Sequence, residues 1–242
     1  MKCKIAFLLV VLFFPAIARS QIVLTIESGN EFLSAKGTVA YPRPVLRLDF
    51  FAKAKSISHT LPECFYANIW FSKSADRASV DTFGDEIDLK LGCEWNGFDG
   101  GIAYFKLFGK GVGDVLQPYL GFSKSFTRLE NHTIAPCVKV EGEIPLGWNN
   151  GAKNGALISL CVSHRFTRGV ISFNQRAAFV YDLGGLKGFE SGWMWRYDAS
   201  FVWPVRNNFQ FKFPTFRTIL PLSIHDMRRN EYAVSGGIVL NY

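Results

Sequence analysis

Alternation of apolar and polar side chains along most of this chain constrains its fold more than any other feature. Between residues 86 and 95 the odd positions carry Ile, Leu, Leu, Cys and Trp, and the even positions carry Glu, Asp, Lys, Gly and Glu. The same period of two recurs at residues 170–183 and 193–203. Because successive side chains of a strand point to opposite faces, each stretch is predicted to be a strand with one apolar face.

Twelve such strands are predicted, most of them near the ten residues with which a tilted strand crosses a membrane. An even number is also usual in single-chain bacterial barrels. Residues 22–27 are interpreted as a lead-in rather than as a thirteenth strand. The expected fold is all-β, an antiparallel transmembrane up-and-down β-barrel of about 12 strands. The predicted strands are 31–40, 45–55, 64–74, 84–96, 100–108, 117–127, 135–146, 156–166, 169–182, 192–204, 207–217 and 231–242.

The last predicted strand is apolar or aromatic at alternate positions and ends on Tyr242. This pattern resembles the C-terminal signature of bacterial outer-membrane β-barrels. The resemblance implies two partners, which are outer-membrane lipid and the barrel assembly machinery that would engage this strand. On this segment alone, the alternative is the last strand of a soluble β-sandwich.

The connections between the predicted strands favour the barrel over the sandwich. If the N terminus is periplasmic, every second connection should be a short turn, as in outer-membrane barrels. Three of these connections are short and turn-like, and the other two, 55–63 and 128–134, are somewhat longer. The connections of the opposite set are longer and richer in Gly, Asn and charge. A sandwich has no reason to alternate its loop lengths. Residues 41–44 are a short exception on the longer side. The short turns are 96–100, 167–169 and 205–207, and the long loops are 75–83, 109–116, 147–155, 184–191 and 218–230.

The N-terminal segment has the pattern of an export signal. A short basic start precedes 14 apolar residues at 5–18, which is too short for a comfortable membrane span and typical of a signal-peptide core. Residues 1–20 are therefore predicted to be a signal peptide. Residues 21–242 are predicted to form the outer-membrane barrel domain.

Charge and aromatic content agree with this assignment. The formal net charge is +7, and three basic residues lie in the predicted signal peptide, which leaves about +4. This mild excess, without a compact Lys/Arg cluster, argues against a nucleic-acid partner. The 23 Phe, 8 Tyr and 6 Trp residues suit a lipid-facing wall with interfacial girdles.

The polar faces of the predicted strands collect ionisable side chains. In a barrel they would point into the lumen, where rings of charge set ion selectivity. The alternative is that they pair across the lumen and close it, because twelve strands leave little free bore once side chains fill it. The predicted lumen-lining residues are Arg47, Lys53, Glu86, Asp88, Lys90, Lys139, Glu141, Arg165, Arg176, Arg196 and Asp198.

Four cysteines follow the predicted signal peptide. Cys137 and Cys161 are both expected to point inward on consecutive strands, and their midpoint, residue 149, lies in the connection between those strands. A disulfide between them is therefore predicted, with two free thiols as the alternative. Cys93 belongs to the outward set of another strand and is expected to stay apart from them.

No catalytic or metal-binding constellation emerges from the sequence. No cysteine pair has the short spacing of a zinc or redox site. His164 is expected on the outward face, and the Ser-x-His spacing of Ser223 and His225 lies in a predicted loop. His132 is also expected in a connection. A hydrolytic triad is thus unsupported, and neither cofactor nor metal is expected.

Four ordered blocks resemble the TorF-type family of outer-membrane porins. They are PVLRLDF at 44–50, FYANIWFS at 65–72, GDEIDL at 84–89 and GGIAY at 100–104. The match covers residues 44 to about 127, and the family's Tyr-x-x-Arg-Gly block near the N terminus is not evident here. The resemblance implies a porin-like barrel without catalytic residues.

These observations together predict a non-enzymatic outer-membrane channel for the passive passage of small polar solutes or ions. The solute is not identified by the sequence. One alternative is a non-conducting barrel with a structural or adhesive role at the cell surface. A less favoured alternative is an outer-membrane hydrolase.

Overall fold

The structure is a computed structural model of the chain. It describes residues 22–29, 32–33, 39–41, 45–54, 62–74, 86–108, 113–147, 152–185, 190–206, 208–223 and 231–241. Within these ranges no helix combines the length and apolarity that a membrane-crossing helix needs. The predicted signal peptide and Tyr242 lie outside the described residues.

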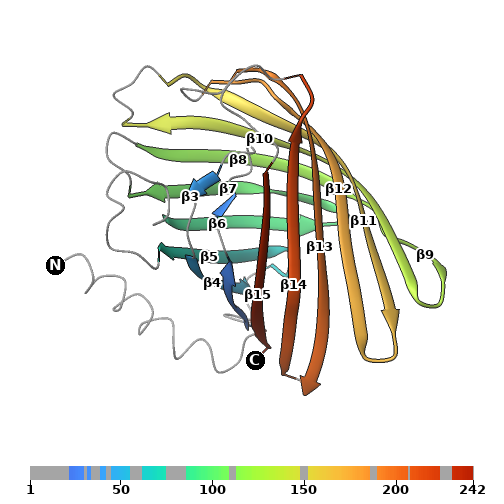
Figure 1. The fold of residues 1–242 in the computed structure, drawn as a ribbon. Helices are drawn as coiled ribbons and strands as arrows, with labels where there is room; N and C mark the ends of the chain where they lie inside the picture. Colours follow the sequence, from blue (N-terminus) through green and yellow to red (C-terminus); the bar gives the residue numbers. More distant parts are fainter. Residues whose placement is uncertain are drawn as a thin grey trace.

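Strands dominate the described chain, as the alternation predicts (Figure 1). Their bounds are β1 (Ile22–Gly29), β2 (Phe32–Leu33), β3 (Val39–Tyr41), β4 (Val45–Lys53), β5 (Phe65–Ser74), β6 (Glu86–Trp95), β7 (Phe98–Leu107), β8 (Asp114–Ser123), β9 (Phe126–Leu129), β10 (His132–Leu146), β11 (Gly155–Arg168), β12 (Ile171–Asp182), β13 (Gly192–Arg206), β14 (Phe209–Pro221) and β15 (Glu231–Asn241).

Twelve of these strands pair antiparallel in a continuous circuit. The order runs β1–β4–β5–β6–β7–β8–β10–β11–β12–β13–β14–β15, and β15 pairs with β1 again. The prediction of an antiparallel barrel of about 12 strands is therefore confirmed. In Figure 1 the strands β5–β8 run steeply across the direction of β13–β15, as tilted strands on opposite walls of a barrel do.

The identity of the first barrel strand was predicted wrongly. The described residues of the predicted strand 31–40 lie in β2 and β3, which pair with each other in a separate small sheet and not with the barrel strands. The strand that pairs with β4 and β15 is β1, which was interpreted as a lead-in. Because β1 is the first barrel strand, the connection to β4 consists of residues 30–44. This connection is at least as long as the other loops of the longer set, so residues 41–44 are no longer a short exception among them.

The predicted strand at 117–127 is divided into two. Both β8 and β9 pair with β10, with Ser123 opposite Cys137 and Phe126 opposite Ile134. The pair β8–β9 thus acts as one interrupted strand of the circuit. The other predicted strands agree with the structure to within a few residues at their ends.

The two halves of the barrel wall differ in length. Strands β4 to β8 have 9 or 10 residues each, whereas β10 to β14 have between 12 and 15. In Figure 1 the turns of the longer strands, and β9 with them, project beyond the rest of the sheet.

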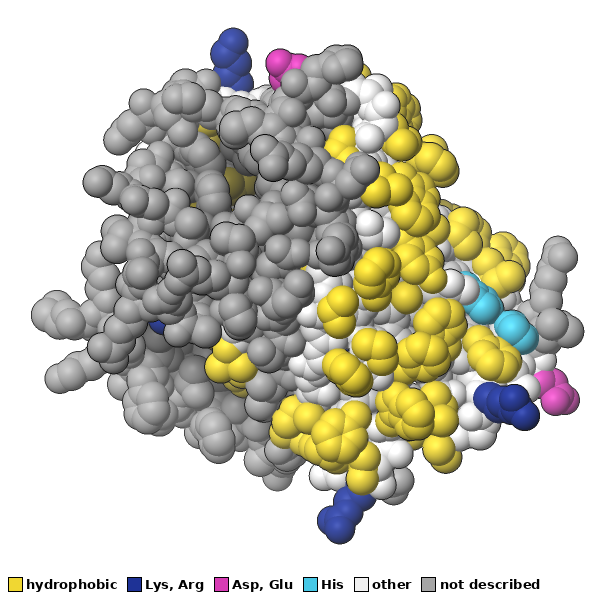
Figure 2. Space-filling view, viewed as in Figure 1, with side chains coloured by type: hydrophobic (Ala, Val, Ile, Leu, Met, Phe, Trp, Pro, Cys, Tyr) yellow, Lys and Arg dark blue, Asp and Glu magenta, His cyan; other side chains and the backbone are white. Residues whose placement is uncertain are grey.

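Large apolar side chains are exposed on the outer face of the barrel. Leu91 is 55% exposed, Leu120 60% and Leu160 53%, and each alternates with a residue of the opposite face. Figure 2 shows such side chains covering most of the described part of one outer face, with charges at its edges. A soluble protein seldom exposes so continuous an apolar surface, and a lipid-facing wall does.

Candidate functional site: the inner wall of the barrel

The inner face is identified by contacts that skip strands. Tyr66 lies on β5 and Tyr119 on β8, so two strands separate them, and yet their hydroxyl oxygens are 2.7 Å apart. Side chains can meet across two intervening strands only on the concave face of a curved sheet. The pairing of Asn68 with Lys90, and of Lys139 with Gly121, extends this face along the neighbouring strands.

All eleven residues predicted to line the lumen lie on strands and alternate in step with this inner set. Arg47 and Lys53 lie on β4, and Glu86, Asp88 and Lys90 lie on β6. Lys139 and Glu141 follow on β10, Arg165 on β11, Arg176 on β12, and Arg196 and Asp198 on β13. Lys53 and Arg165 are exposed, and the others are partly or fully buried.

A tyrosine-centred cluster occupies the wall formed by β5 to β8. The Tyr66 hydroxyl donates to Asp99 Oδ1 at 2.5 Å, and Lys90 Nζ lies 3.4 Å from Asp99 Oδ2. Lys90 Nζ also lies 4.2 Å from the centre of the Tyr119 ring, within the range of a cation–π contact. The cluster needs room, which Gly92 provides, because a Cβ there would fall 2.1 Å from the Tyr119 hydroxyl.

Acidic groups continue from this cluster along β6. Glu86 is only 7% exposed, and Asp88 is the next residue of the inner face along the same strand. The buried Asp88 Oδ1 has no hydrogen-bond partner among the described residues. On the far side of the cluster, Lys139 Nζ lies 2.6 Å from Glu141 Oε1.

A basic cluster occupies the wall formed by β12 to β14. Asp198 accepts from Arg196 Nε at 2.8 Å and from Arg217 Nε at 2.5 Å. Arg176 is the register partner of Asp198 on the next strand, and its buried Nε has no partner in the described part of the chain. A cavity of about 540 Å³ opens against this cluster, and its lining also includes Lys212.

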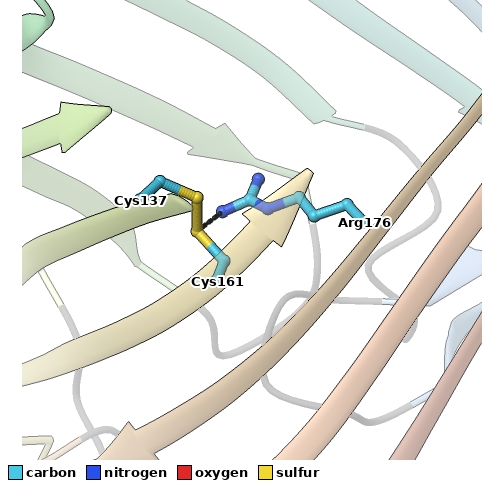
Figure 3. The surroundings of a disulfide bond; sticks show 3 residues. All are labelled: Cys137, Cys161 and Arg176. Carbon is cyan, nitrogen blue, oxygen red and sulfur yellow. Dashed lines mark hydrogen bonds between the residues drawn. A yellow bond between two sulfur atoms is a disulfide. The ribbon is translucent and has the colours of Figure 1, made fainter. Parts of the chain in front are cut away.

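A disulfide joins the two cysteines predicted to pair. Cys137 and Cys161 are register partners on β10 and β11, with their Cα atoms 4.9 Å apart, inside the usual range for a disulfide. Arg176 Nη2 donates to Cys161 Sγ at 3.2 Å, which orders the guanidinium beside the bond (Figure 3). Cys64 and Cys93 are free thiols.

Toward the loop end of β11 to β14 the inner wall becomes apolar. Leu157, Val180, Met194 and Ile219 pack together there, and Met194 and Ile219 have no exposed surface.

Several residues of the inner wall were not predicted from the sequence. Arg217 was missed because the ladder of β14 with β15 shifts between Lys212 and Thr215, which reverses the alternation within one predicted strand. Asp99 was placed in a turn, although β7 already begins at Phe98. Tyr119 was missed because aromatic side chains were expected on the outer face.

His164 lies in the outward set, as predicted, and takes part in a polar chain. The rings of His132 and His164 are stacked with centroids 5.2 Å apart, and Gln175 Nε2 lies 2.8 Å from His164 Nδ1. The Tyr197 hydroxyl in turn donates to Gln175 at 2.7 Å. His132 begins β10, so its prediction as a loop residue was wrong. His225 lies outside the described residues, and within the described ranges no group of three or more His, Cys, Asp or Glu could hold a metal.

No family model and no curated protein matches this chain. Among solved structures, it is similar to the NanC porin, with a TM-score of 0.56 and 6% identity over 90% of this chain and 100% of that one. It is also similar to the KdgM porin, with a TM-score of 0.53 and 9% identity over 92% and 99% of the two chains. An outer-membrane channel from Pseudomonas putida F1 gives a TM-score of 0.53 and 9% identity over 92% and 95%. At these identities the likeness concerns the fold, which is that of outer-membrane porin barrels.

Proposed function

We propose that this protein is an outer-membrane channel through which small polar solutes or ions pass passively. One observation carries the proposal. The inner wall of the twelve-stranded barrel bears charged side chains on β4, β6, β7 and β10 to β14, whereas the outer wall is apolar. Charged groups are costly to bury without water, so an inner wall of this kind favours a hydrated lumen. The porins with a similar fold support the proposal, as does the predicted signal peptide.

The proposed relationship to the TorF-type porins rests on the four strand motifs alone. Nothing in the proposal requires a cofactor, a metal or a catalytic side chain. The residues that we propose to line the pore are those predicted from the alternation, extended by Asp99, Lys212 and Arg217.

A non-conducting barrel is the second candidate, and the apolar cluster at the loop end of β11 to β14 favours it. Met194 and Ile219 are fully buried although they alternate in step with the inner wall, so other groups cover this part of it. A barrel narrowed in this way could serve as a structural or adhesive surface protein.

Single-channel recording in planar bilayers separates the two candidates. The detergent-folded protein is expected to give discrete conductance steps, and heat-unfolded protein from the same preparation is expected to give none. Arg196→Gln removes a charge from the inner wall, so it should move the reversal potential in a salt gradient toward that of a cation-preferring pore.

The matched control is Arg168→Gln, which makes the same change at an exposed position at the end of β11. It should leave the reversal potential unchanged. A folded protein without conductance steps would contradict the channel and favour the sealed barrel. Equal shifts of the reversal potential by the two substitutions would show that Arg196 does not line the pore.

A further inference from the structure

Two opposite arcs of the inner wall carry an excess of charge of opposite sign. The acidic arc is formed by β6 and β7, where Glu86, Asp88, Glu94 and Asp99 outnumber Lys90 among the described inner residues. With four carboxyl groups against one ammonium group, this arc has an excess of acidic side chains.

The basic arc is formed by β12 to β14. Its inner face carries Arg176, Arg196, Lys212 and Arg217, against Asp198 and the terminal Asp182. The described part of this arc is therefore net positive, opposite in sign to the acidic arc.

The strand order sets the two arcs against each other across the barrel. Five strands separate β6 from β13 in either direction around the circuit, and five separate β7 from β14. Strands equally spaced in this way lie on opposite walls, so an electric field crosses the lumen from the basic to the acidic arc.

Both arcs keep polar atoms that the described protein groups do not satisfy. On the basic arc these include Arg176 Nε, beside the cavity of about 540 Å³. On the acidic arc Asp88 Oδ1 has no partner among the described residues. Buried polar atoms usually have a partner, so these two arcs are the parts of the inner wall where the described protein groups leave polar atoms unsatisfied.

A solute that carries both a positive and a negative charge has the most favourable electrostatic interaction with such a wall. An anion is attracted by one arc and repelled by the other, and so is a cation, whereas a zwitterion can turn its carboxylate to the arginines and its ammonium group to the carboxylates. We propose that the lumen selects zwitterionic small solutes, of the class of free amino acids, over uncharged solutes of the same size. This inference rests on the proposed channel function.

The experiment measures solute entry into proteoliposomes by osmotic swelling. The probes are 4-aminobutyrate as the zwitterion, erythritol as the uncharged solute and butyrate as the anion, which are of comparable size. The unmodified protein is expected to admit 4-aminobutyrate several-fold faster than erythritol.

Two variants test the two arcs separately. Glu86→Gln with Asp88→Asn keeps the shape of the acidic arc but replaces two of its four carboxyl groups by uncharged amides, which lowers its negative charge. Arg176→Gln with Arg196→Gln discharges the basic arc and leaves the Asp198–Arg217 pair in place. Each variant is expected to lower the rate of 4-aminobutyrate toward that of erythritol, while the erythritol rate stays the same. Heat-modifiable migration on gels verifies that each variant is folded.

The outcomes separate this inference from the function on which it rests. No entry of any probe would reject the channel function and the inference with it. Entry of erythritol and 4-aminobutyrate at equal rates would reject the inference alone. Faster butyrate entry, slowed only by the arginine substitutions, would identify a simple anion filter and would likewise overturn it.

Discussion

Glycine at position 101 allows the tyrosine cluster of the inner wall to form. A Cβ at Gly101 would lie 2.1 Å from the Leu91 carbonyl oxygen and 2.5 Å from the Tyr119 hydroxyl. The first of these atoms belongs to the backbone of the neighbouring strand and cannot move away without disturbing the ladder. The close packing of β6, β7 and the tyrosines therefore depends on the absence of a side chain at this position.

Gly101→Ala is accordingly expected to lower the yield of folded barrel and its unfolding temperature. Gly121→Ala on β8 is the matched control, because the nearest atom to a Cβ there is 3.4 Å away, an ordinary contact. The measurement is the folded fraction on unheated gels and its loss with temperature. Equal stability of the two variants would show that the wall relaxes around Gly101 at no cost.

Residue positions of this kind were only partly predictable from sequence. The face of Glu86 or Arg176 follows from alternation alone, since both lie in uninterrupted strands. The face of Arg217 does not, because the shifted register at Lys212 and Thr215 depends on how β14 meets β15. Contacts between strands that are not neighbours, such as Tyr66 with Tyr119, require the curvature of the closed sheet.

At the scale of elements, the β10–β11 hairpin is the best-determined unit in the sequence. Its register follows from a symmetric connection around residue 149, and the structure pairs Cys137 with Cys161 as that symmetry requires. By contrast, alternation in residues 31–40 and in β1 could not decide which segment belongs to the barrel. A strand's pattern specifies its faces but not its partners, and closure of the circuit selects β1.

The disulfide is expected to stabilise this hairpin in the folded protein. Non-reducing peptide mapping should recover Cys137 and Cys161 in linked peptides. Replacing both by serine should lower stability by about 3 kcal/mol, the entropy of closing a loop of this length, and lower the unfolding temperature. The control is Cys64→Ser with Cys93→Ser, since these thiols are free. Complete alkylation of Cys137 and Cys161 without reductant would rule the bond out.

At the scale of the whole molecule, β1 closes the barrel, because it pairs with β4 on one side and with the last strand, β15, on the other. Thr25 is the register partner of both Asp49 on β4 and Val239 on β15. Its backbone therefore lies within two ladders, and unpaired backbone groups are costly in lipid, at several kcal/mol each.

Thr25→Pro removes an N–H from this junction and is expected to abolish most of the heat-modifiable, folded form. Thr25→Val retains the N–H and suits a strand, so it should fold as the unmodified protein does. The measurement is the folded fraction after insertion into detergent or lipid. Normal folding of the proline variant would mean that β1 is a dispensable lead-in after all.

The unequal lengths of the barrel wall have a consequence for the surrounding bilayer. At about 3.3 Å per residue and about 45° of tilt, the 10 residues of β6 rise about 23 Å and the 15 residues of β13 rise about 35 Å. A hydrocarbon layer about 30 Å thick cannot match both sides. An upright barrel would compress the annular lipid beside β4 to β8, and a leaning one would share the mismatch around its circumference. The unequal strand lengths therefore favour one particular direction in which the barrel axis tilts away from the membrane normal.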